Sequence, residues 1–373
     1  MHPPSLLVVG GGIAGMSVAI RMRDIGWEVD LIEIDPQWRV YGTGISITAP
    51  TFRASQRLGI VEEIIRQGFG SNKGVRICAP DGRLIAESPV EPIGPGLPSN
   101  GGILRPVLHK ILSSRTRESG VNVRLGVTVG TVASDVQGVN VETTDGRQRR
   151  YSLVVGADGV HSQLREQLFG KTVVPRYTGQ YCWRLVAQRP PEIDTVHFYM
   201  AGPVTAGLMP ISDTQMYMFL LQQEAEKVRL EEDTQWQRLR DLMRPFGGIP
   251  GTLRDELSQG SPIIARPLEA LLLPRPWSVG RVLLMGDAVH ATTPHLASGA
   301  GLCMEDALVL AEEIERHGDV VAALQAYEAR RWERCRLVVE NSVTIGRMEQ
   351  EHANPGAIQK LMAESEAALR EEI

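Results

Sequence analysis

The start of the chain carries the feature that most limits its fold. An apolar run at Leu6–Val9 is followed directly by the glycine-rich stretch Gly10–Gly15, and a helical pattern continues to Arg23. A second apolar run, Val29–Ile32, closes on the acidic residue Glu33. A strand, a GxGxxG turn, a helix and a strand in this order predict a βαβ unit of the dinucleotide-binding type.

Each glycine of this motif has a physical task in such a unit. Gly10 allows the tight turn, Gly12 lets a pyrophosphate approach the backbone, and Gly15 lets the helix pack closely. Glu33 stands where an acid accepts hydrogen bonds from the adenosine ribose, which disfavours a 2′-phosphate. The motif predicts a dinucleotide but does not by itself separate FAD from NAD.

A second glycine-marked strand end lies near the other end of the chain. Val282–Met285 is predicted to be a short buried strand, Gly286 permits a sharp turn, and Asp287 follows at once. A small-residue loop at 297–301 comes next, and a helical pattern runs from Leu302 onward. This arrangement would point a carboxylate at a polyol and a helix N-terminus at negative charge.

A third apolar strand end lies between these two. The segment 154–165 predicts a buried strand that ends at Gly156, a turn at Asp158 and Gly159, and a helix that Ser162 can cap. Asp-Gly pairs are common in turns, so turn chemistry alone could explain the pair. Its position after a strand end favours a ligand role.

Two further stretches could lie beside the cofactor. The segment 38–47 is predicted to be a loop in which Gly42 and Gly44 could let the backbone pass close to a flat ring, although an ordinary loop fits equally well. The segment 102–112 predicts the start of a helix with Arg105 near its beginning. That arginine could neutralise a pyrophosphate or could be a solvated helix charge.

The rest of the pattern predicts an α/β chain with an inserted sheet. Strand-like runs dominate 177–267 with one helix around Trp236–Met243, the segment 75–86 predicts a hairpin, and four runs between 121 and 155 alternate like antiparallel strands. We therefore predict a Rossmann-like domain, an interleaved sheet-rich domain and C-terminal helices. The expected boundaries are 1–73, 100–176 and 268–340 for the first domain, 74–99 and 177–267 for the second, and 341–373 for the C-terminal helical segment.

Composition excludes several classes of function. The net charge is −5 and no basic patch stands out, so no nucleic-acid partner is expected. No apolar stretch is long enough to span a bilayer, and the short glycine-rich N-terminal run does not fit a secretory signal. The four cysteines form no CxxC pair, which favours free thiols over disulfides or zinc. We expect a cytoplasmic protein with no metal and no membrane partner.

With these pieces in place, the chain resembles the FAD-dependent aromatic hydroxylases, the single-component flavoprotein monooxygenases of the para-hydroxybenzoate hydroxylase type. The resemblance covers essentially the whole chain. It depends on three motifs in the family's order: GxGxxG at 10–15 with Glu33, the DG motif at 156–159, and the GD motif at 286–288 followed by Pro294. The first domain would then bind FAD, and the sheet-rich domain would bind substrate.

The resemblance implies FAD as the cofactor, bound by residues of all three motifs. Glu33 would bind the adenosine ribose, Arg105 would lie by the pyrophosphate, and Asp287 would hold ribityl-side groups. Many members have Gly-Gln-Gly where this chain has the small residues of 297–301, so one side-chain contact is lost while a backbone N–H can still serve the flavin. The cofactor-binding residues carried over are Gly10, Gly12, Ile13, Ala14, Gly15, Glu33, Gly44, Arg105, Asp158, Gly286, Asp287, Gly299, Ala300 and Gly301.

The resemblance also implies the chemistry. NADH or NADPH would bind transiently and reduce the FAD, and a flavin C4a-hydroperoxide would hydroxylate a small aromatic or heteroaromatic substrate. Pro294 would lie beside the flavin ring, and His295 is our candidate catalytic base because histidine titrates in the required range. His290 is expected to be structural. The candidate substrate-binding residues, each of which could instead be an ordinary sheet residue, are Arg184, His197, Tyr199, Met209, Tyr217 and Phe219.

Three functions stay open at this point. The first is an aromatic hydroxylase whose partners are a small aromatic substrate and O2, as a monomer or homodimer. The second is an epoxidase or reductase of the same flavoprotein fold. The third is a non-catalytic FAD-binding protein.

Overall fold

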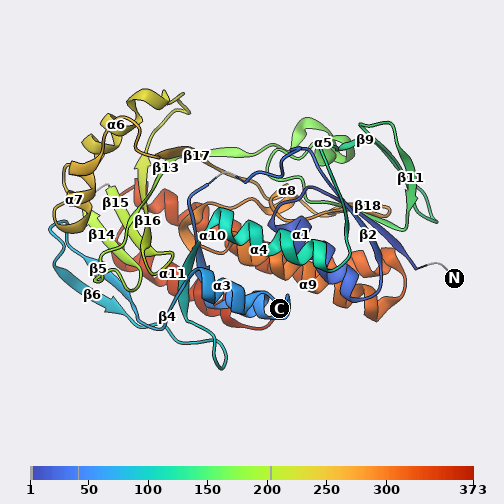
Figure 1. The fold of residues 1–373 in the computed structure, drawn as a ribbon, viewed down its shortest axis with the longest axis horizontal. Helices are drawn as coiled ribbons and strands as arrows, with labels where there is room; N and C mark the ends of the chain where they lie inside the picture. Colours follow the sequence, from blue (N-terminus) through green and yellow to red (C-terminus); the bar gives the residue numbers. More distant parts are fainter. Residues whose placement is uncertain (1–2, 41, 202–203) are drawn as a thin grey trace.

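The computed structural model describes residues 3–40, 42–201 and 204–373. Figure 1 shows two sheet-containing ends with long helices between them. The helices in the middle include α9 (Gly299–His317) and α10 (Val320–Gln350). The chain is a mixed α/β protein, as the sequence predicts.

A six-stranded sheet in the order β18-β19-β12-β1-β2-β8 forms the Rossmann-like end. β1 and β2 are parallel neighbours, and α1 (Ile13–Asp24) connects them, so the predicted βαβ unit is confirmed. Only β18 at the edge runs antiparallel to its neighbour. The strands are β1 (Ser5–Val9), β2 (Glu28–Glu33), β8 (Asn122–Leu125), β12 (Leu153–Gly156), β18 (Ser278–Val279) and β19 (Val282–Leu284).

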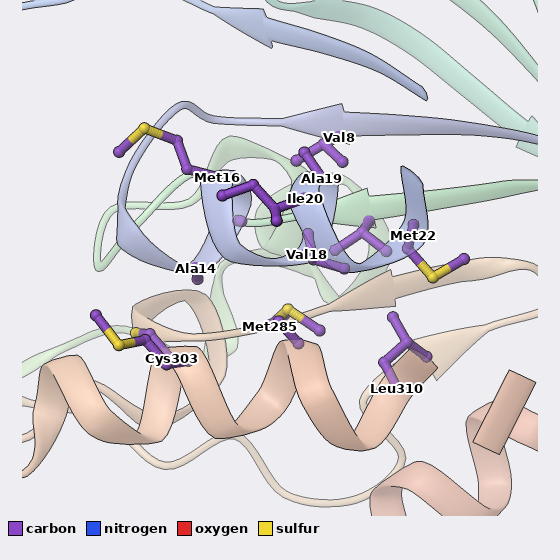
Figure 2. Packing of buried hydrophobic residues seen from close by; sticks show 14 of the residues in the cluster. Val8, Ala14, Met16, Val18, Ala19, Ile20, Met22, Met285, Cys303 and Leu310 are labelled. Carbon is purple, nitrogen blue, oxygen red and sulfur yellow. The ribbon is translucent and has the colours of Figure 1, made fainter. Parts of the chain in front are cut away.

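Apolar packing between α1 and α9 closes one face of this sheet. Figure 2 shows Ala14 and Met22 of α1 pointing toward Cys303 and Leu310 of α9, with Met285 between the two helices. Both helices are almost continuously buried along their lengths. The glycine motif at one end of the chain is therefore packed against the helix that follows the GD motif.

The prediction of four antiparallel strands between 121 and 155 was wrong at both ends. β8 pairs with β2 and β12 pairs with β1, in both cases in parallel. Only the three strands between them form an antiparallel sheet, namely β9 (Val129–Ser134), β10 (Val139–Thr143) and β11 (Gln148–Tyr151). β12 is buried at every residue, and such a continuous apolar run is typical of a parallel strand covered on both faces.

A seven-stranded sheet in the order β17-β13-β16-β15-β14-β5-β6 forms the other end. Helices α6 (Gln235–Leu242) and α7 (Gly248–Glu256) pack on one of its faces; the sequence predicted α6 but not α7. The strands are β5 (Val75–Cys78), β6 (Leu84–Ser88), β13 (Arg176–Gln188), β14 (His197–Ala201), β15 (Val204–Pro210), β16 (Gln215–Gln223) and β17 (Ile264–Ala270).

A small antiparallel sheet in the order β3-β7-β4 connects the two ends. The prediction of a loop over 38–47 was wrong for its second half, because β3 spans Gly44–Thr48. The prediction of a helix from 102 was wrong by three residues. β7 (Asn100–Leu104) precedes α4 (Arg105–Glu118), and Pro106 sits in the first helical turn, where a proline is well tolerated.

The C-terminal third is helical, as predicted, but α9 begins at Gly299 rather than at Leu302. The small residues of the expected loop therefore form the first helical turn. No helix among the residues described in the structure is long and apolar enough to cross a membrane. The remaining elements are β4 (Phe69–Ser71), α2 (Ala49–Arg57), α3 (Val61–Gln67), α5 (Gln163–Phe169), α8 (Asp287–His290) and α11 (Pro355–Arg370), with 3-10 turns η1 (Gly170–Thr172), η2 (Glu232–Thr234) and η3 (Pro294–Leu296).

Candidate active site

The glycine turn after β1 is shaped by close backbone contacts. Gly10 has a φ of +103°, and a Cβ there would lie 2.4 Å from the Ala157 carbonyl oxygen. A Cβ on Gly15 would lie 1.9 Å from the Gly10 carbonyl oxygen, so only glycine lets α1 approach the strand. At Gly12 nothing lies within 4 Å of a Cβ. The turn is thus tight on two sides and open at the position where we expect a pyrophosphate.

Glu33 holds this turn, and its binding of the adenosine ribose stays a prediction. Its carboxylate accepts hydrogen bonds from the Gly11 N–H at 2.7 Å and from the Asp35 N–H at 2.9 Å. The indole N–H of Trp38 donates to the Gly11 carbonyl at 2.9 Å. This role of Trp38 was not predicted from the sequence, because Trp38 has an unusual φ of +49° that no local pattern indicates.

The DG motif and the helix after it contact both of the other motifs. The Asp158 carboxylate accepts from the Ser162 hydroxyl and from the Leu164 N–H, and Ser162 accepts from the Arg165 N–H at 2.9 Å, which confirms the predicted cap. The buried Arg165 side chain donates to the carbonyl of Ala288 at 2.9 Å. Asp158 therefore caps α5, and a direct contact with FAD stays a prediction for it.

The GD turn places a carboxylate at the start of α8. Gly286 has a φ of +63°, and a Cβ there would lie 2.7 Å from the Cβ of Ala14. Asp287 follows as the first residue of α8 with an exposed side chain.

The N-terminus of α9 lies beside this turn. The first turn of α9 consists of Gly299, Ala300 and Gly301. The N–H groups of a first helical turn have no acceptor within the helix. A Cβ on Gly301 would lie 2.4 Å from the Thr51 hydroxyl oxygen. The helix therefore presents free N–H groups and the positive end of its dipole at the position predicted to serve the flavin.

A chain of contacts links these residues to the seven-stranded sheet. Arg105 acts electrostatically on Asp287 and packs against Gly42, where a Cβ would lie 2.6 Å from its Cδ. A Cβ on Gly44 would lie 2.7 Å from the ring of Tyr217 on β16. The glycines of this segment thus allow close packing of β3 on the sheet.

The face of the sheet that meets β3 carries four of the six predicted substrate residues: Arg184, Met209, Tyr217 and Phe219. Arg184 Nε donates to the Tyr217 hydroxyl at 3.1 Å, and burial raises the pKa of Tyr217 to about 12 although Arg184 opposes the rise. The rings of Tyr217 and Phe219 lie 5.7 Å apart, which confirms that they share a face. We call this the inner face.

The structure separates the other two predicted substrate residues, His197 and Tyr199, from this group. Tyr199 packs in the hydrophobic cluster under α6 and α7, and His197 follows the same strand parity and contacts Arg76. We withdraw both, because the two faces of one sheet cannot line one site. Phe198 between them faces inward instead, with its ring 5.8 Å from that of Phe219.

His295, the candidate base, is turned toward α10. Its side chain is 2% exposed, its Nδ1 lies 2.9 Å from the Thr293 hydroxyl, and its Nε2 lies 3.4 Å from the Glu349 carboxylate. Gly346 makes room for the ring. Pro294 precedes it at the start of η3. Whether either residue acts in catalysis stays a prediction.

His290 belongs to a buried ionic cluster. Its Nε2 lies 2.7 Å from the Asp306 carboxylate, and the sulfur of Cys335 is close to both. Burial opposes charge on His290, but Cys335 and Asp306 outweigh it and raise the pKa of His290. Burial also opposes ionisation of Asp306, but His290 and Arg331 hold its pKa at about 2. We interpret the group as ion-paired rather than metal-binding, because Arg331 would repel a cation.

Comparison with known proteins agrees with this arrangement. The family model described as "FAD binding domain" matches residues 4–342. The Bacillus subtilis protein named "Putative FAD-dependent monooxygenase YetM" is 32% identical over 98% of this chain and 99% of its own length. The 2-heptyl-3-hydroxy-4(1H)-quinolone synthase of Pseudomonas aeruginosa is 30% identical over 93% of this chain and 90% of its own.

A solved structure shows the same fold with the cofactor in place. The crystal structure of an arginine-to-glutamine variant of Klebsiella pneumoniae HpxO complexed with FAD has a TM-score of 0.84 at 25% identity. The match covers 100% of this chain and 95% of that chain. The chain therefore belongs to the FAD-dependent monooxygenases of the aromatic hydroxylase type, and its cofactor is FAD.

Proposed function

We propose that the protein uses NADH or NADPH and O2 to hydroxylate a small aromatic or heteroaromatic substrate at the junction of its two sheet-containing ends. One observation carries this proposal: Arg105, which packs against Gly42 and is near enough to Asp287 to interact with it electrostatically, is joined through Gly44 of the same segment to Tyr217 and its partner Arg184. This arrangement joins the turn that we assign to the cofactor to the predicted substrate residues of the inner face. We accordingly assign FAD binding to the Rossmann-like end and substrate binding to the seven-stranded sheet.

The residues present fit FAD. Gly12 leaves open space at the expected pyrophosphate, Arg105 supplies positive charge, and Asp287 has an exposed carboxylate for the ribityl side. The first turn of α9 offers N–H groups to negative charge on the ring. When bound, FAD supplies electron transfer from the nicotinamide and activation of O2.

The inner face suits a planar ring that carries an anionic or carbonyl oxygen. Arg184 is permanently charged, and Tyr217 with its raised pKa is a neutral phenol at physiological pH. Both can donate hydrogen bonds to such an oxygen, while Met209, Phe198 and Phe219 supply apolar contact. The name of the quinolone synthase describes a hydroxylated nitrogen heterocycle, which favours the heteroaromatic class for this chain too.

Pro294 and His295 remain our candidates beside the ring. Because His295 is bonded to the buried Thr293 and turned toward Glu349, we propose that it acts as a positioning residue rather than by touching the substrate. A His295→Gln variant separates these roles. If His295 is a base that touches the substrate, the substitution should shift the pH profile of kcat. If His295 is a positioning residue, the substitution should change KM and kcat together and leave the pH profile unshifted.

The test of the function is oxidation of NADH and NADPH by the FAD-loaded protein across phenols, hydroxybenzoates, hydroxypyridines and quinolones. The molecular masses of the products are measured by mass spectrometry after incubation with 18O2. A compound that speeds oxidation and gains one 18O atom supports the proposal and identifies the ring. Uncoupled peroxide formation with every compound contradicts it.

Two other outcomes would support the alternatives. Substrate-dependent turnover that proceeds without O2 would indicate a reductase, and an epoxide product would indicate an epoxidase. FAD that neither nicotinamide reduces would indicate a non-catalytic FAD-binding protein.

A further inference from the structure

A fully buried carboxylate lies directly beneath the GD turn. Asp306 on α9 is 0% exposed. Its Oδ2 accepts a hydrogen bond from the Gly286 N–H at 3.2 Å and lies 2.7 Å from His290 Nε2. One oxygen atom is therefore bonded to both ends of the short segment that contains Asp287.

Asp306 is itself fixed from the opposite side. Its Oδ1 accepts from Arg331 Nε of α10 at 2.8 Å, and Arg331 also donates to the Glu305 carboxylate at 3.0 Å and to the Leu302 carbonyl at 3.3 Å. Arg334 binds both oxygens of Glu305 at 2.8 Å. Buried charges of this kind are tolerated when every partner is in place, and removal of one partner is costly.

The contacts within the turn itself do not fix it. Gly286 already packs against Ala14 of α1, and α8 is only four residues long, so its own hydrogen bonds cannot fix it. The Asp287 side chain is exposed, whereas Asp306 is buried. The position of Asp287 is decided by the segment around it, which Asp306 holds through the Gly286 N–H and the His290 ring, in addition to the bond from Arg165 to the Ala288 carbonyl.

We propose that Asp306, held by Arg331, is a positioning residue that sets the Asp287 carboxylate for FAD. The proposal builds on the assignment of Asp287 to the cofactor under the proposed function. Removal of the Asp306 charge would weaken its bonds to Gly286 and His290 together. The Asp287 carboxylate would then be less well positioned, and FAD would bind more weakly.

A double-mutant cycle tests this on the whole protein. FAD is removed and its Kd is measured by flavin fluorescence for the wild type, Asp287→Ala, Asp306→Asn and the double variant. We expect Asp306→Asn to raise Kd about 10-fold or more alone and by less than about 2-fold in the Asp287→Ala background, because coupled residues are not additive. The proposal is overturned if Asp306→Asn raises Kd equally in both backgrounds.

Asp30 provides a matched control. It is another buried aspartate of the same end of the molecule, and it accepts hydrogen bonds from Asn122 at 2.9 Å, Arg149 at 2.9 Å and Tyr151 at 2.6 Å. Asp30→Asn removes a buried charge on β2, which two strands separate from β19 and the GD turn, and should change Kd by less than about 2-fold. An equal loss with Asp30→Asn would mean a general loss of structure and would overturn the proposal.

Two further outcomes are separated by the same data. If Asp287→Ala leaves Kd unchanged, both the assignment of Asp287 to FAD and this inference fail. If Asp287→Ala weakens binding but Asp306→Asn does not, only this inference fails. Should Asp306→Asn not fold, Arg331→Lys, which keeps the charge but loses the forked donor geometry, goes through the same cycle with a smaller expected rise of about 3-fold.

Discussion

The two ends of the molecule treat buried charge in different ways. Beneath the GD turn, Asp306 is paired with His290 and Arg331, and Arg331 also donates to the carboxylate of Glu305. On the inner face of the seven-stranded sheet, Arg184 is bonded to the Tyr217 hydroxyl, and no salt bridge joins it to a carboxylate among the residues described in the structure. The difference indicates that the first group fixes backbone geometry, whereas the second keeps a positive charge available for a ligand.

The largest effect should come from breaking the paired group. Arg331→Ala leaves the carboxylates of Glu305 and Asp306 without their shared partner and should lower the free energy of unfolding by about 3–5 kcal/mol, measured by urea titration of the FAD-free protein. Arg336→Ala on the same helix removes an arginine paired with the exposed Glu333 and should cost less than about 1 kcal/mol. Equal costs would contradict the contrast between fixed and exposed pairs.

Removal of the charge on the inner face should affect substrate rather than stability. Arg184→Gln should raise KM for an anionic substrate about 30-fold, which corresponds to ~2 kcal/mol for a charged hydrogen bond, with little change in FAD affinity. Arg76→Gln is the control, because that guanidinium is already paired with Asp194 and Glu87. If Arg184→Gln lowers stability and leaves KM unchanged, the charge is structural.

His197 gives a pH test of the far face of the same sheet. Burial lowers the pKa of His197 to about 4, with a contribution from Arg76, while Asp194 and Glu87 oppose the shift. Below the usual histidine pKa of about 6.5 the unfolded chain takes up a proton that the folded protein does not, so stability falls as pH drops from 6.5 toward 4.

Urea unfolding at pH 7 and pH 5 measures this effect. The wild type should lose about 2 kcal/mol more between these values than His197→Gln does. His161→Gln, which changes an exposed histidine, should behave like the wild type. An unchanged pH dependence in His197→Gln would mean that His197 is not kept neutral by burial.

The smallest expected effect comes from removing one tyrosine hydroxyl from each face of the seven-stranded sheet. Tyr217→Phe removes the hydroxyl that Arg184 contacts and should raise KM about 5-fold, or ~1 kcal/mol. Tyr199→Phe makes the same change under α6 and α7 and should leave KM within about 2-fold. A larger effect from Tyr199 would restore it to the substrate site.

The local geometry of the three motifs follows from the order of residues within each motif. Gly10 and Gly286 have positive φ values that favour glycine, and Gly15 lies against the Gly10 carbonyl of the same turn. These requirements arise within a few residues of chain. The βαβ unit, the Ser162 cap and the shared face of Tyr217 and Phe219 follow from equally local patterns. For this reason they were predictable from the order and spacing of residues.

Which distant parts of the chain meet depends on how the elements pack in three dimensions. Strand parity puts Phe198 on one face and its neighbours on the other, but the choice of the inner face depends on where α6 and α7 pack. The bonds of Asp306 to Gly286 and Arg331 join α9 to the GD turn and to α10. Such contacts carry no local signature, because they form only when segments distant in sequence are packed together.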